Sequence, residues 1–453
     1  MRIVIFGCGE IGTTIISALQ DEGHDIIAID RDVNTVEEIT NIYDVMGLSG
    51  NGVDTFTMNE AGVGEADLFV SVTNSDELNM LSCFLARKMG AKHTIARIRN
   101  PEYNDDSLSF VRNHLDLSMA LNPERIIAHE IFNMLRFPAA VNVETFSGRN
   151  LEIIELLLKQ DSPFADVTLS ELRKKHKEMF LVCDVLRGDR VYIPDGNFKL
   201  QVGDRIGITA PHNEMLKLLK NLGLPQRLPR TVVILGASRT SYYLAKMLMG
   251  AGVKVKIIDR DREKCVSYSV ALPDAVIIQG DGMKQEILLE EGIASTGAYI
   301  ALTGNDEENI LSSYFAKEQK VPTVVTRINR QELVLTAEKL GLECIVSPQK
   351  SVSNVLSRYV RALQNSVGSN METLYKLCDG KVEVLEFKVT GEFEYINIPL
   401  RDMKLKQEVL VAGIVRGRKP MIPNGSDVIL PNDKVIVLAA GEQLRDLSDI
   451  IEK

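Results

Sequence analysis

The sequence predicts an α/β protein with two Rossmann-like, doubly wound parallel-sheet domains, each followed by a small α+β module. An apolar, strand-like run at 2–6 leads directly into a glycine-rich loop and then into a helical pattern. Strand-like and helical segments alternate over positions 1–120, as is typical of a parallel sheet covered by helices on both faces. The same arrangement returns in the second half of the chain, starting with the apolar run at 231–235, which indicates an internal duplication.

The first Rossmann-like domain contains strand patterns and helical patterns in alternation. Short runs rich in β-branched and aromatic residues predict strands at 2–6, 25–29, 67–72 and 93–97. Longer segments with apolar residues at helical spacing predict helices near 10–22, 33–41, 75–89 and 123–135.

The second copy keeps the register of the first over five blocks. Gly7 corresponds to Gly236 and Asp30 to Asp259, at the same offset along the chain. The stretch TNSDELN at 73–79 corresponds to TGNDEEN at 303–309, where the offset has grown by a single position. Chance does not produce five blocks at a nearly constant offset, so the second half is expected to repeat the fold of the first.

A different pattern follows each Rossmann-like domain. The turn motifs IPDG at 193–196 and IPNG at 422–425 each lead to a short strand, and they are separated by the same offset as the two glycine loops. A helix is expected to close each module, near 212–221 and 441–452. A linker with two prolines at 224–229 and a hinge at 364–371 complete the organisation. The predicted domains are two Rossmann-like domains at 1–135 and 227–366, and two small modules at 136–226 and 367–453.

Composition and charge exclude several classes of protein. A net charge of −10 argues against the basic surface that binds nucleic acid and against a general attraction to anionic lipid. The six cysteines form no CxxC pair, which argues against a disulfide framework or a zinc site. No stretch approaches the roughly 18 apolar residues of a spanning helix, and the N-terminus runs straight into a strand without a signal peptide pattern. We therefore expect a cytoplasmic protein that can still dock onto a membrane protein.

The first glycine loop consists of Gly7, Cys8, Gly9, Glu10, Ile11 and Gly12. A loop that leaves a strand and opens a helix presents free N–H groups and the positive end of the helix dipole to an anion. The three glycines would allow the tight turn, the approach of a pyrophosphate and the close packing of helix on strand. Asp30 stands at the end of the second predicted strand, where it can accept hydrogen bonds from an adenosine ribose. An acid there favours NAD over NADP, and the lack of a basic residue in the loop favours a dinucleotide over a triphosphate. A plain glycine turn that only packs a strand on a helix is the alternative.

Further candidates follow the later strands. Thr73 and Asn74 come after the fourth strand, and Arg97 ends the fifth, where it could reach a phosphate. Capping of the next helix, which opens at Ser75, is the competing explanation for the Thr73 segment. Asn51, in a Gly-Asn-Gly turn, could contact the adenine edge.

The second loop, at 236–241, keeps the first glycine and loses the other two. Ser238 replaces the middle glycine, where a Cβ obstructs a pyrophosphate, and Ser241 replaces the last, where it is expected to spread the helix from the strand. The second loop either binds a nucleotide in another pose or binds none and is kept because the fold still needs a turn between strand and helix. Its candidate contacts are Gly236, Ser238, Arg239, Asp259 and Asp281.

No pattern for catalysis or for a metal stands out. The six histidines do not recur between the repeats, and GxSxG, HExxH and the Walker lysine are absent. The small modules are too short for a typical substrate domain of a dehydrogenase. The acidic run at 306–308 reads better as a solvated helix start than as a cation site. An NAD-dependent oxidoreductase therefore remains only an alternative.

Taken together, the GCGEIG loop with Asp30, the TNSDELN stretch, the segment RIRNPEY and the paired IPDG and IPNG modules resemble the tandem RCK/KTN family of peripheral subunits of Trk potassium uptake systems. The resemblance covers the whole chain and implies a gating function without chemistry. It implies that NAD, NADH, ADP or ATP is bound by the first loop together with Asp30, Thr73, Asn74 and Arg97. The serines at 238 and 241 depart from the family's glycine pattern.

The resemblance also implies partners. Family members form a cytosolic ring beneath a membrane potassium channel or transporter of the TrkH/TrkG type, peripheral at the inner face of the membrane. For a chain with two RCK domains, a tetramer would give a ring of eight. An RCK-type regulator of a different transporter is the remaining alternative.

Overall fold

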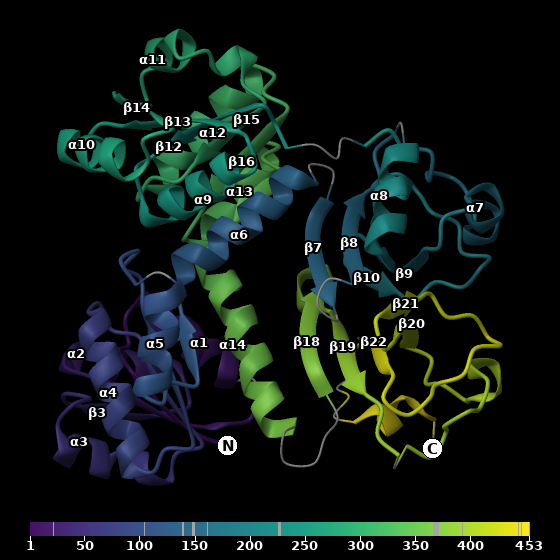
Figure 1. Ribbon diagram of the computed structural model, residues 1–453, viewed down its shortest axis with the longest axis horizontal. Coiled ribbons are helices and arrows are strands. Elements are labelled where there is room, and N and C mark those ends of the chain that lie inside the picture. The colour runs from purple at the N-terminus through teal and green to yellow at the C-terminus, as the bar shows by residue number, and fades with distance from the viewer. Residues whose placement is uncertain are drawn as a thin grey trace. The chain divides into compact units, whose positions relative to one another are not determined.

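The computed structural model describes the whole chain except residues 21, 104, 138–139, 147–149, 161, 225–227, 366–370, 392, 443, 445 and 453. The chain forms two compact units (Figure 1). The first unit combines Met1–Phe132 with Pro229–Ser357, and the second combines Asn133–Leu228 with Arg358–Lys453. Each repeat thus gives its Rossmann-like domain to one unit and its small module to the other.

The first Rossmann-like domain is built on a six-stranded parallel sheet with the strand order β3-β2-β1-β4-β5-β6. This order reverses between β1 and β4, which is the point where doubly wound sheets open a crevice for a ligand. Its strands are β1 (Arg2–Phe6), β2 (Asp25–Asp30), β3 (Met46–Ser49), β4 (Leu68–Ser71), β5 (His93–Arg97) and β6 (Met119–Leu121). Its helices are α1 (Glu10–Gln20), α2 (Val33–Ile42), α3 (Thr55–Glu60), α4 (Asp76–Met89), α5 (Asp105–His114) and α6 (Pro123–Arg136).

The sequence explains why these elements form. The central strands β1 and β4 are buried almost throughout and are apolar except for Arg2 and Ser71 at their ends, as expected for a parallel sheet with two covered faces. Aspartate or serine caps open three of the helices: Asp32 for α2, Asp54 for α3 and Ser75 for α4. The four predicted strands and four predicted helices are confirmed to within two residues, whereas β3, β6, α3 and α5 were not predicted.

The second Rossmann-like domain repeats the first. Its parallel sheet has the order β14-β13-β12-β15-β16-β17, so the predicted duplication is confirmed. The strands are β12 (Thr231–Leu235), β13 (Lys254–Asp259), β14 (Val276–Gln279), β15 (Ala298–Ala301), β16 (Thr323–Arg327) and β17 (Cys344–Val346). The helices are α9 (Arg239–Gly250), α10 (Arg262–Ala271), α11 (Gln285–Glu290), α12 (Asp306–Glu318), α13 (Gln331–Lys339) and α14 (Pro348–Asn365).

The two small modules are five-stranded antiparallel sheets with equivalent strand orders, β7-β8-β11-β9-β10 and β18-β19-β22-β20-β21. The first consists of β7 (Ala140–Phe146), β8 (Leu151–Leu157), α7 (Leu169–Lys175), β9 (Leu181–Arg187), β10 (Arg190–Tyr192), β11 (Arg205–Pro211) and α8 (His212–Asn221). The second consists of β18 (Met371–Leu377), β19 (Val382–Lys388), β20 (Val409–Arg416), β21 (Lys419–Met421) and β22 (Lys434–Ala440).

Each module contains an equivalent ion pair between a buried aspartate and a partly exposed arginine. Arg187 donates to both carboxylate oxygens of Asp204 at 2.7 and 2.8 Å, and Arg416 does the same to Asp433 at 2.9 and 2.8 Å. Both aspartates are only 1% exposed, so the fork of the guanidinium supplies their charge balance and their geometry.

The predicted ends of the modules are only partly correct. Helix α8 confirms the expectation for 212–221, but the expectation of a helix over 441–452 is wrong. Among the described residues of that segment only a 3₁₀ turn forms, at Leu447–Ile450, capped by Asp446. A single turn is enough to bury Leu447 and Ile450, which lie three residues apart, in the module's core. The predicted domain boundaries at 226/227 and 366/367 lie outside the described residues.

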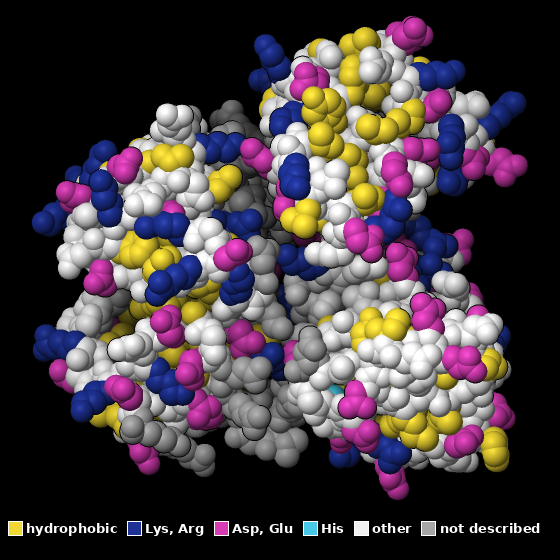
Figure 2. Space-filling view, turned by 180° about the vertical axis from the view of Figure 1, so that it is seen from behind, with side chains coloured by type: hydrophobic (Ala, Val, Ile, Leu, Met, Phe, Trp, Pro, Cys, Tyr) yellow, Lys and Arg dark blue, Asp and Glu magenta, His cyan; other side chains and the backbone are white. Residues whose placement is uncertain are grey.

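The surface carries both signs of charge. On the face drawn in Figure 2, basic and acidic side chains are interspersed among small apolar patches. Within the described part of the chain, no helix combines the length and the apolar character needed to span a membrane.

Candidate functional site

The first glycine loop is a tight turn between β1 and α1 that leaves no room for side chains at two of its glycines. Gly7 has a φ of 96°, and a Cβ there would lie 2.8 Å from the backbone nitrogen of Thr73. A Cβ at Gly12 would lie 1.9 Å from the carbonyl oxygen of Gly7. A Cβ at Gly9, by contrast, would meet nothing within 4 Å. Gly7 and Gly12 therefore serve the fold, and Gly9 keeps open the space in front of the helix.

Asp30 is held at the end of β2 by the loop that it faces. Its Oδ2 accepts a hydrogen bond from the backbone N–H of Cys8 at 2.7 Å, and its Oδ1 accepts one from Asp32 at 3.0 Å. Each carboxylate oxygen keeps a second lone pair for a ligand. Burial, reinforced by the charge of Asp30, raises the pKa of the Cys8 thiol to about 12, so this cysteine is a neutral packing residue.

These groups line one cavity of about 720 Å³, within the range of small-molecule sites. Of the predicted first-site residues, the cavity brings together Gly7, Gly9, Glu10, Ile11, Asp30, Thr73, Asn74 and Arg97. Cys8 and Gly12 are buried members of the loop that do not line the cavity. Asn51 does not line it either; its side-chain oxygen accepts a hydrogen bond from the guanidinium of Arg31 at 3.0 Å. None of the six histidines lies among the described residues that line the cavity.

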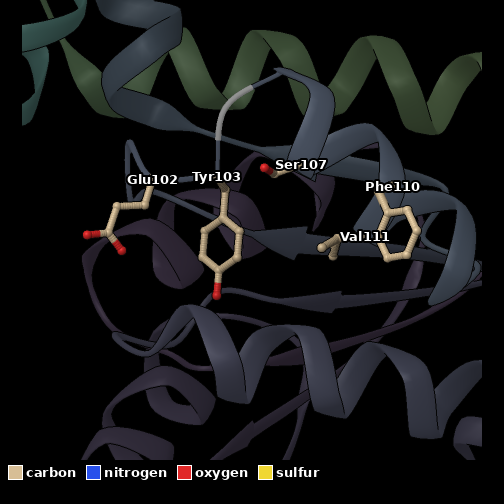
Figure 3. A pocket seen from close by; sticks show the side chains of 5 residues that line it. All are labelled: Glu102, Tyr103, Ser107, Phe110 and Val111. Atoms are coloured by element: carbon tan, nitrogen blue, oxygen red, sulfur yellow. The ribbon is translucent and has the colours of Figure 1, made fainter.

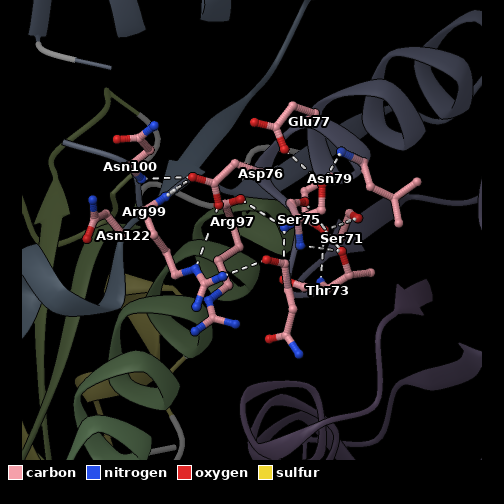
Figure 4. Close-up of polar contacts among 12 residues, drawn as sticks. Ser71, Thr73, Ser75, Asp76, Glu77, Asn79, Arg97, Arg99, Asn100 and Asn122 are labelled. Atoms are coloured by element: carbon pink, nitrogen blue, oxygen red, sulfur yellow. Dashed lines mark hydrogen bonds and ion pairs between the residues drawn. The ribbon is translucent and has the colours of Figure 1, made fainter. Parts of the chain in front are cut away.

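The Thr73 segment both caps a helix and lines the cavity, so the two explanations do not exclude each other (Figure 4). Ser75 accepts the N–H of Leu78 and thus caps α4. Thr73 donates its hydroxyl and its backbone N–H to the side-chain oxygen of Asn79, at 2.7 and 2.8 Å. Asn79 in turn donates to the carbonyl oxygen of Arg97 at 2.9 Å. This network fixes the ends of β4 and β5 against each other, and Thr303 and Asn309 repeat it in the second domain.

A pair of arginines closes the cavity on the β5 side. Arg99 donates to the carbonyl oxygen of Asn74 at 2.6 Å, and Asp76 accepts the backbone N–H of Arg99 at 2.8 Å. The Arg97 guanidinium forms no hydrogen bond or ion pair with any residue that the structure describes, and its Nε is buried without a partner. Burial, followed by the charge of Arg99, lowers the pKa of Arg97, and the charges of Glu124 and Asp76 offset part of this effect. Burying a cation without a partner costs free energy, and an anionic ligand that pairs with it would recover that cost.

In the second loop, N–H and hydroxyl groups that could donate to a ligand form hydrogen bonds within the loop instead. Ser238 caps α9 by accepting the N–H of Ser241, and the Ser241 hydroxyl donates to the carbonyl oxygen of Gly236 at 2.5 Å. Ser241 therefore ties the helix to the turn, where the sequence had suggested that it would spread them. The hydroxyl of Tyr268 also donates to the carbonyl oxygen of Ser238 at 2.6 Å.

A smaller cavity of about 480 Å³ remains in the second domain. Of the predicted residues, Gly236, Ser238, Asp259 and Asp281 line it, whereas Arg239 does not. Asp259 keeps the role of Asp30, because its Oδ2 accepts the N–H of Ala237 at 2.6 Å. The cavity adds Arg260 and Lys264, two cations that the sequence analysis did not single out.

The two Rossmann-like domains contact each other within the first unit. The hydroxyl of Tyr243 donates to the carbonyl oxygen of Arg99 at 3.2 Å and accepts from Asn122 at 3.0 Å. Charges also act across this contact: Arg239 of the second domain interacts with Arg97, and Glu10 of the first domain interacts with Arg327. The first cavity thus gains positive charge from the second domain, while the arginine of the second cavity is offset by a carboxylate.

Sequence reasoning missed several lining residues of the first cavity, above all Arg31, Thr35 and Arg99. Arg99 follows Arg97 by two residues, and that spacing on an extended segment was the available signal. A separate hollow at α5, shown in Figure 3, is lined by Glu102, Tyr103, Ser107, Phe110 and Val111. It offers one carboxylate and no cation among the described residues, so it does not have the chemistry of a nucleotide site.

Comparisons with known proteins agree with this architecture. The TrkA-N domain model matches residues 3–110 and 232–348, and the TrkA-C domain model matches 153–242 and 384–452. The chain is 31% identical over 99% of its length to a "Trk system potassium uptake protein TrkA homolog" of Archaeoglobus fulgidus, which is covered completely.

Two solved structures share the fold at low sequence identity. The "GsuK channel bound to NAD" aligns with a TM-score of 0.66 and 17% identity, over 97% of this chain and 77% of that one. The "GsuK bound to ADP" aligns with a TM-score of 0.52 and 16% identity, over 81% and 69%. With both domain models matched twice, in tandem, and a curated relative covered from end to end, the chain belongs to the TrkA family.

Proposed function

We propose that this protein is a nucleotide-sensing regulatory subunit of a Trk-type potassium uptake system, one that acts in the cytoplasm at the inner face of the membrane. The observation that carries the proposal is the first cavity, where an open helix N-terminus, the Asp30 carboxylate and the unpartnered Arg97 face one space. These are the groups that a dinucleotide requires for its pyrophosphate and its ribose. The full-length relative named as a potassium uptake protein supports the transport role.

NAD or NADH is the proposed ligand, with ADP or ATP as the alternative. The acid at Asp30 favours a free ribose over a 2′-phosphate. The proposed contacts are Gly7, Gly9, Glu10, Ile11, Asp30, Thr73, Asn74 and Arg97, all of which line the cavity. The solved structures of similar fold were determined with NAD and with ADP, which supports a nucleotide of this class. The second cavity, around Asp259 and Asp281, is proposed to bind the nucleotide with lower affinity. The Ser238 side chain already accepts the hydrogen bond of a helix N–H group that a phosphate would need.

The partner is proposed to be a membrane potassium channel or transporter subunit of the TrkH/TrkG type. A tetramer of this chain, giving a ring of eight Rossmann-like domains, is the proposed assembly. Exposed apolar residues recur at equivalent places on the two domains and supply surfaces for such a ring: Leu81 on α4 is 49% exposed and Leu311 on α12 is 57% exposed. A ligand would gate the partner through a difference in its affinity for two states of the ring.

Calorimetry on the full-length protein tests the ligand. We expect each of two variants to weaken NAD binding by at least about tenfold: Gly9→Val fills the space in front of the helix, and Asp30→Ala removes charge-assisted hydrogen bonds that contribute about 1.5–3 kcal/mol. Gly250→Val is the matched control, because a Cβ at Gly250, as at Gly9, meets nothing within 4 Å, and Gly250 lies outside both cavities. Unchanged affinity in both site variants would refute the assignment.

A flux assay tests the function. The protein is added to vesicles that contain the membrane partner, and potassium flux is followed with and without NAD or ADP. A nucleotide-dependent change in flux that Asp30→Ala abolishes supports the proposal. Turnover of NADH with a small substrate would favour an oxidoreductase instead.

A further inference from the structure

Two buried carboxylates face each other across a glycine in the first small module. Glu155 of β8 and Asp184 of β9 both pair with Gly207 of the central strand β11, so the three residues form one row across the sheet. Glu155 is 3% exposed and Asp184 is 0% exposed. A Cβ at Gly207 would lie 2.0 Å from Oδ2 of Asp184, so only glycine leaves the space between the strands open.

A thiol from the other module of the same unit completes the cluster. Cys378, which directly follows β18, donates its backbone N–H to Oε1 of Glu155 at 2.9 Å. Its Sγ lies 3.1 Å from Oδ1 of Asp184, and one ligand atom of each of the three residues lies within 4.8 Å of the others. A β-bulge at Gly207/Ile208 places Cys183 beside Asp184, with its Sγ 3.5 Å from Oδ2. A second thiol is therefore within reach of the cluster.

The charge of the cluster is not balanced by protein groups. Neither Glu155 nor Asp184 forms an ion pair with a lysine or arginine anywhere in the described part of the chain. Two buried carboxylates so close together are costly unless a proton or a cation compensates them. Asp184 accepts hydrogen bonds from the thiols of Cys378 and Cys183 and from the backbone of Gly207, and Glu155 accepts one from the backbone of Cys378, but none of these donors carries a positive charge.

The duplicated module provides an internal comparison. In the equivalent row of its sheet, Glu386 pairs with Ile436, which pairs in turn with Gly413. The glutamate is kept, but Ile436 fills the central position and the second carboxylate is missing. Glu386 is also balanced directly, because Nζ of Lys434 lies 3.3 Å from its Oε1. One row thus holds a carboxylate paired with a lysine, whereas the other holds two carboxylates, approached by the thiol of Cys378, and no cation among the described residues.

From this geometry we propose that Glu155, Asp184 and Cys378 bind one divalent transition-metal ion of the zinc class. Thiolate and carboxylate donors together suit a borderline-soft ion better than calcium or magnesium, which prefer oxygen alone. Three protein ligands leave a fourth position for Cys183 or water. No CxxC spacing reveals the site, because Cys378 lies 223 and 194 residues from its two partners in the sequence. The ion would bind both small modules at once and does not depend on the nucleotide site.

Metal titration of the full-length protein tests the site. The purified chain is stripped with a chelator under reducing conditions and titrated with Zn²⁺ against a chromogenic chelator, and with Co²⁺ as a spectroscopic probe. We expect one tightly bound ion per chain and a thiolate-to-cobalt charge-transfer band. Cys378→Ser should abolish the part of the band that Cys378 contributes, and both Cys378→Ser and Asp184→Asn should weaken Zn²⁺ binding by at least about tenfold.

Cys265→Ser is the matched control, because this cysteine is also buried but donates to the carbonyl oxygen of Asp259 in the second Rossmann-like domain. It should leave affinity and spectrum unchanged. A stripped wild-type chain that takes up no stoichiometric Zn²⁺ or Co²⁺ overturns the proposal, as does an unchanged Zn²⁺ affinity in Cys378→Ser or in Asp184→Asn. Circular dichroism reports whether each variant folds, and if neither does, the presence or absence of the cobalt band in the wild type decides.

Discussion

Replacement of Arg97 by glutamine is expected to change ligand affinity and stability in opposite directions. The Arg97 guanidinium is partly buried and its Nε has no partner; Arg99 and Arg239 repel it, whereas Glu124 and Asp76 attract it, and burial remains the largest effect. Without ligand, the charge of Arg97 therefore lowers the stability of the folded state. With a bound pyrophosphate, the same charge would be satisfied.

The magnitudes follow from the cost of orphaned groups. A buried donor without a partner costs about 1–3 kcal/mol, and a hydrogen bond to a charged group contributes about 1.5–3 kcal/mol. Arg97→Gln should therefore weaken NAD binding by about 10- to 100-fold. The free energy of unfolding without ligand should stay the same or rise by about 1 kcal/mol.

Arg327→Gln is the matched control for this experiment. Arg327 is the equivalent residue of the second domain and is also buried, but its guanidinium donates to Asn329 at 3.3 and 3.2 Å and interacts with Glu10. This variant should lose stability and keep its affinity for NAD at the first site. Calorimetry gives the affinities, and urea unfolding of the ligand-free proteins gives the stabilities. The reasoning is refuted if Arg97→Gln unfolds as easily as Arg327→Gln while its NAD affinity stays unchanged.

Three further expectations concern stability. Gly12→Ala should destabilise the protein by about 1–3 kcal/mol or more in urea unfolding, because its Cβ would lie 1.9 Å from a carbonyl oxygen, whereas Gly9→Ala should cost far less. Asp204→Asn should cost about 1.5–3 kcal/mol in the same assay, since it removes the charge-assisted hydrogen bonds of a buried carboxylate to Arg187, which stays partly solvated. Burial raises the pKa of Glu130 above its ordinary 4.5, although a hydrogen bond from Ser351 opposes this. The stability from its protonated form is thus full below about pH 4.5 and is lost as the pH rises through the raised pKa, so Glu130→Gln should remove that part of the pH dependence of unfolding.

The sequence predicted the Rossmann-like domains well because their signals are local. An apolar run, a glycine loop and a helical pattern follow one another in β1 and α1, and the duplication doubles every signal. The short strand β3 was missed because its four residues, Met46–Ser49, are only partly apolar. The helix predicted over 441–452 was wrong because burial of two apolar residues three apart does not distinguish a 3₁₀ turn from a longer helix.

The sites were less predictable, because they depend on contacts between distant segments. The loop and Asp30 follow from spacing alone, whereas the charge of Arg239 at Arg97 depends on how two domains pack. The carboxylate and thiol cluster depends on strand register: Gly207 must pair with both Glu155 and Asp184 before their side chains meet. No periodicity in one segment carries that information.

The unequal loops acquire a physical meaning from the contact between the domains. Glu10 and Arg239 occupy equivalent positions, directly after Gly9 in the first loop and Ser238 in the second, and carry opposite charges. Each acts on an arginine of the other domain: Arg239 makes the surroundings of Arg97 more positive, and Glu10 offsets Arg327. The serines of the second loop use its donors in internal hydrogen bonds, and Arg239 adds a small positive contribution at Arg97, where Glu124 and Asp76 act in the opposite direction. If the first cavity binds the dinucleotide, its affinity for that ligand depends on the contact with the second domain. Any movement that separates the two domains would then weaken ligand binding. By reciprocity, the bound ligand would hold them together, which is the coupling that a sensor in a ring requires.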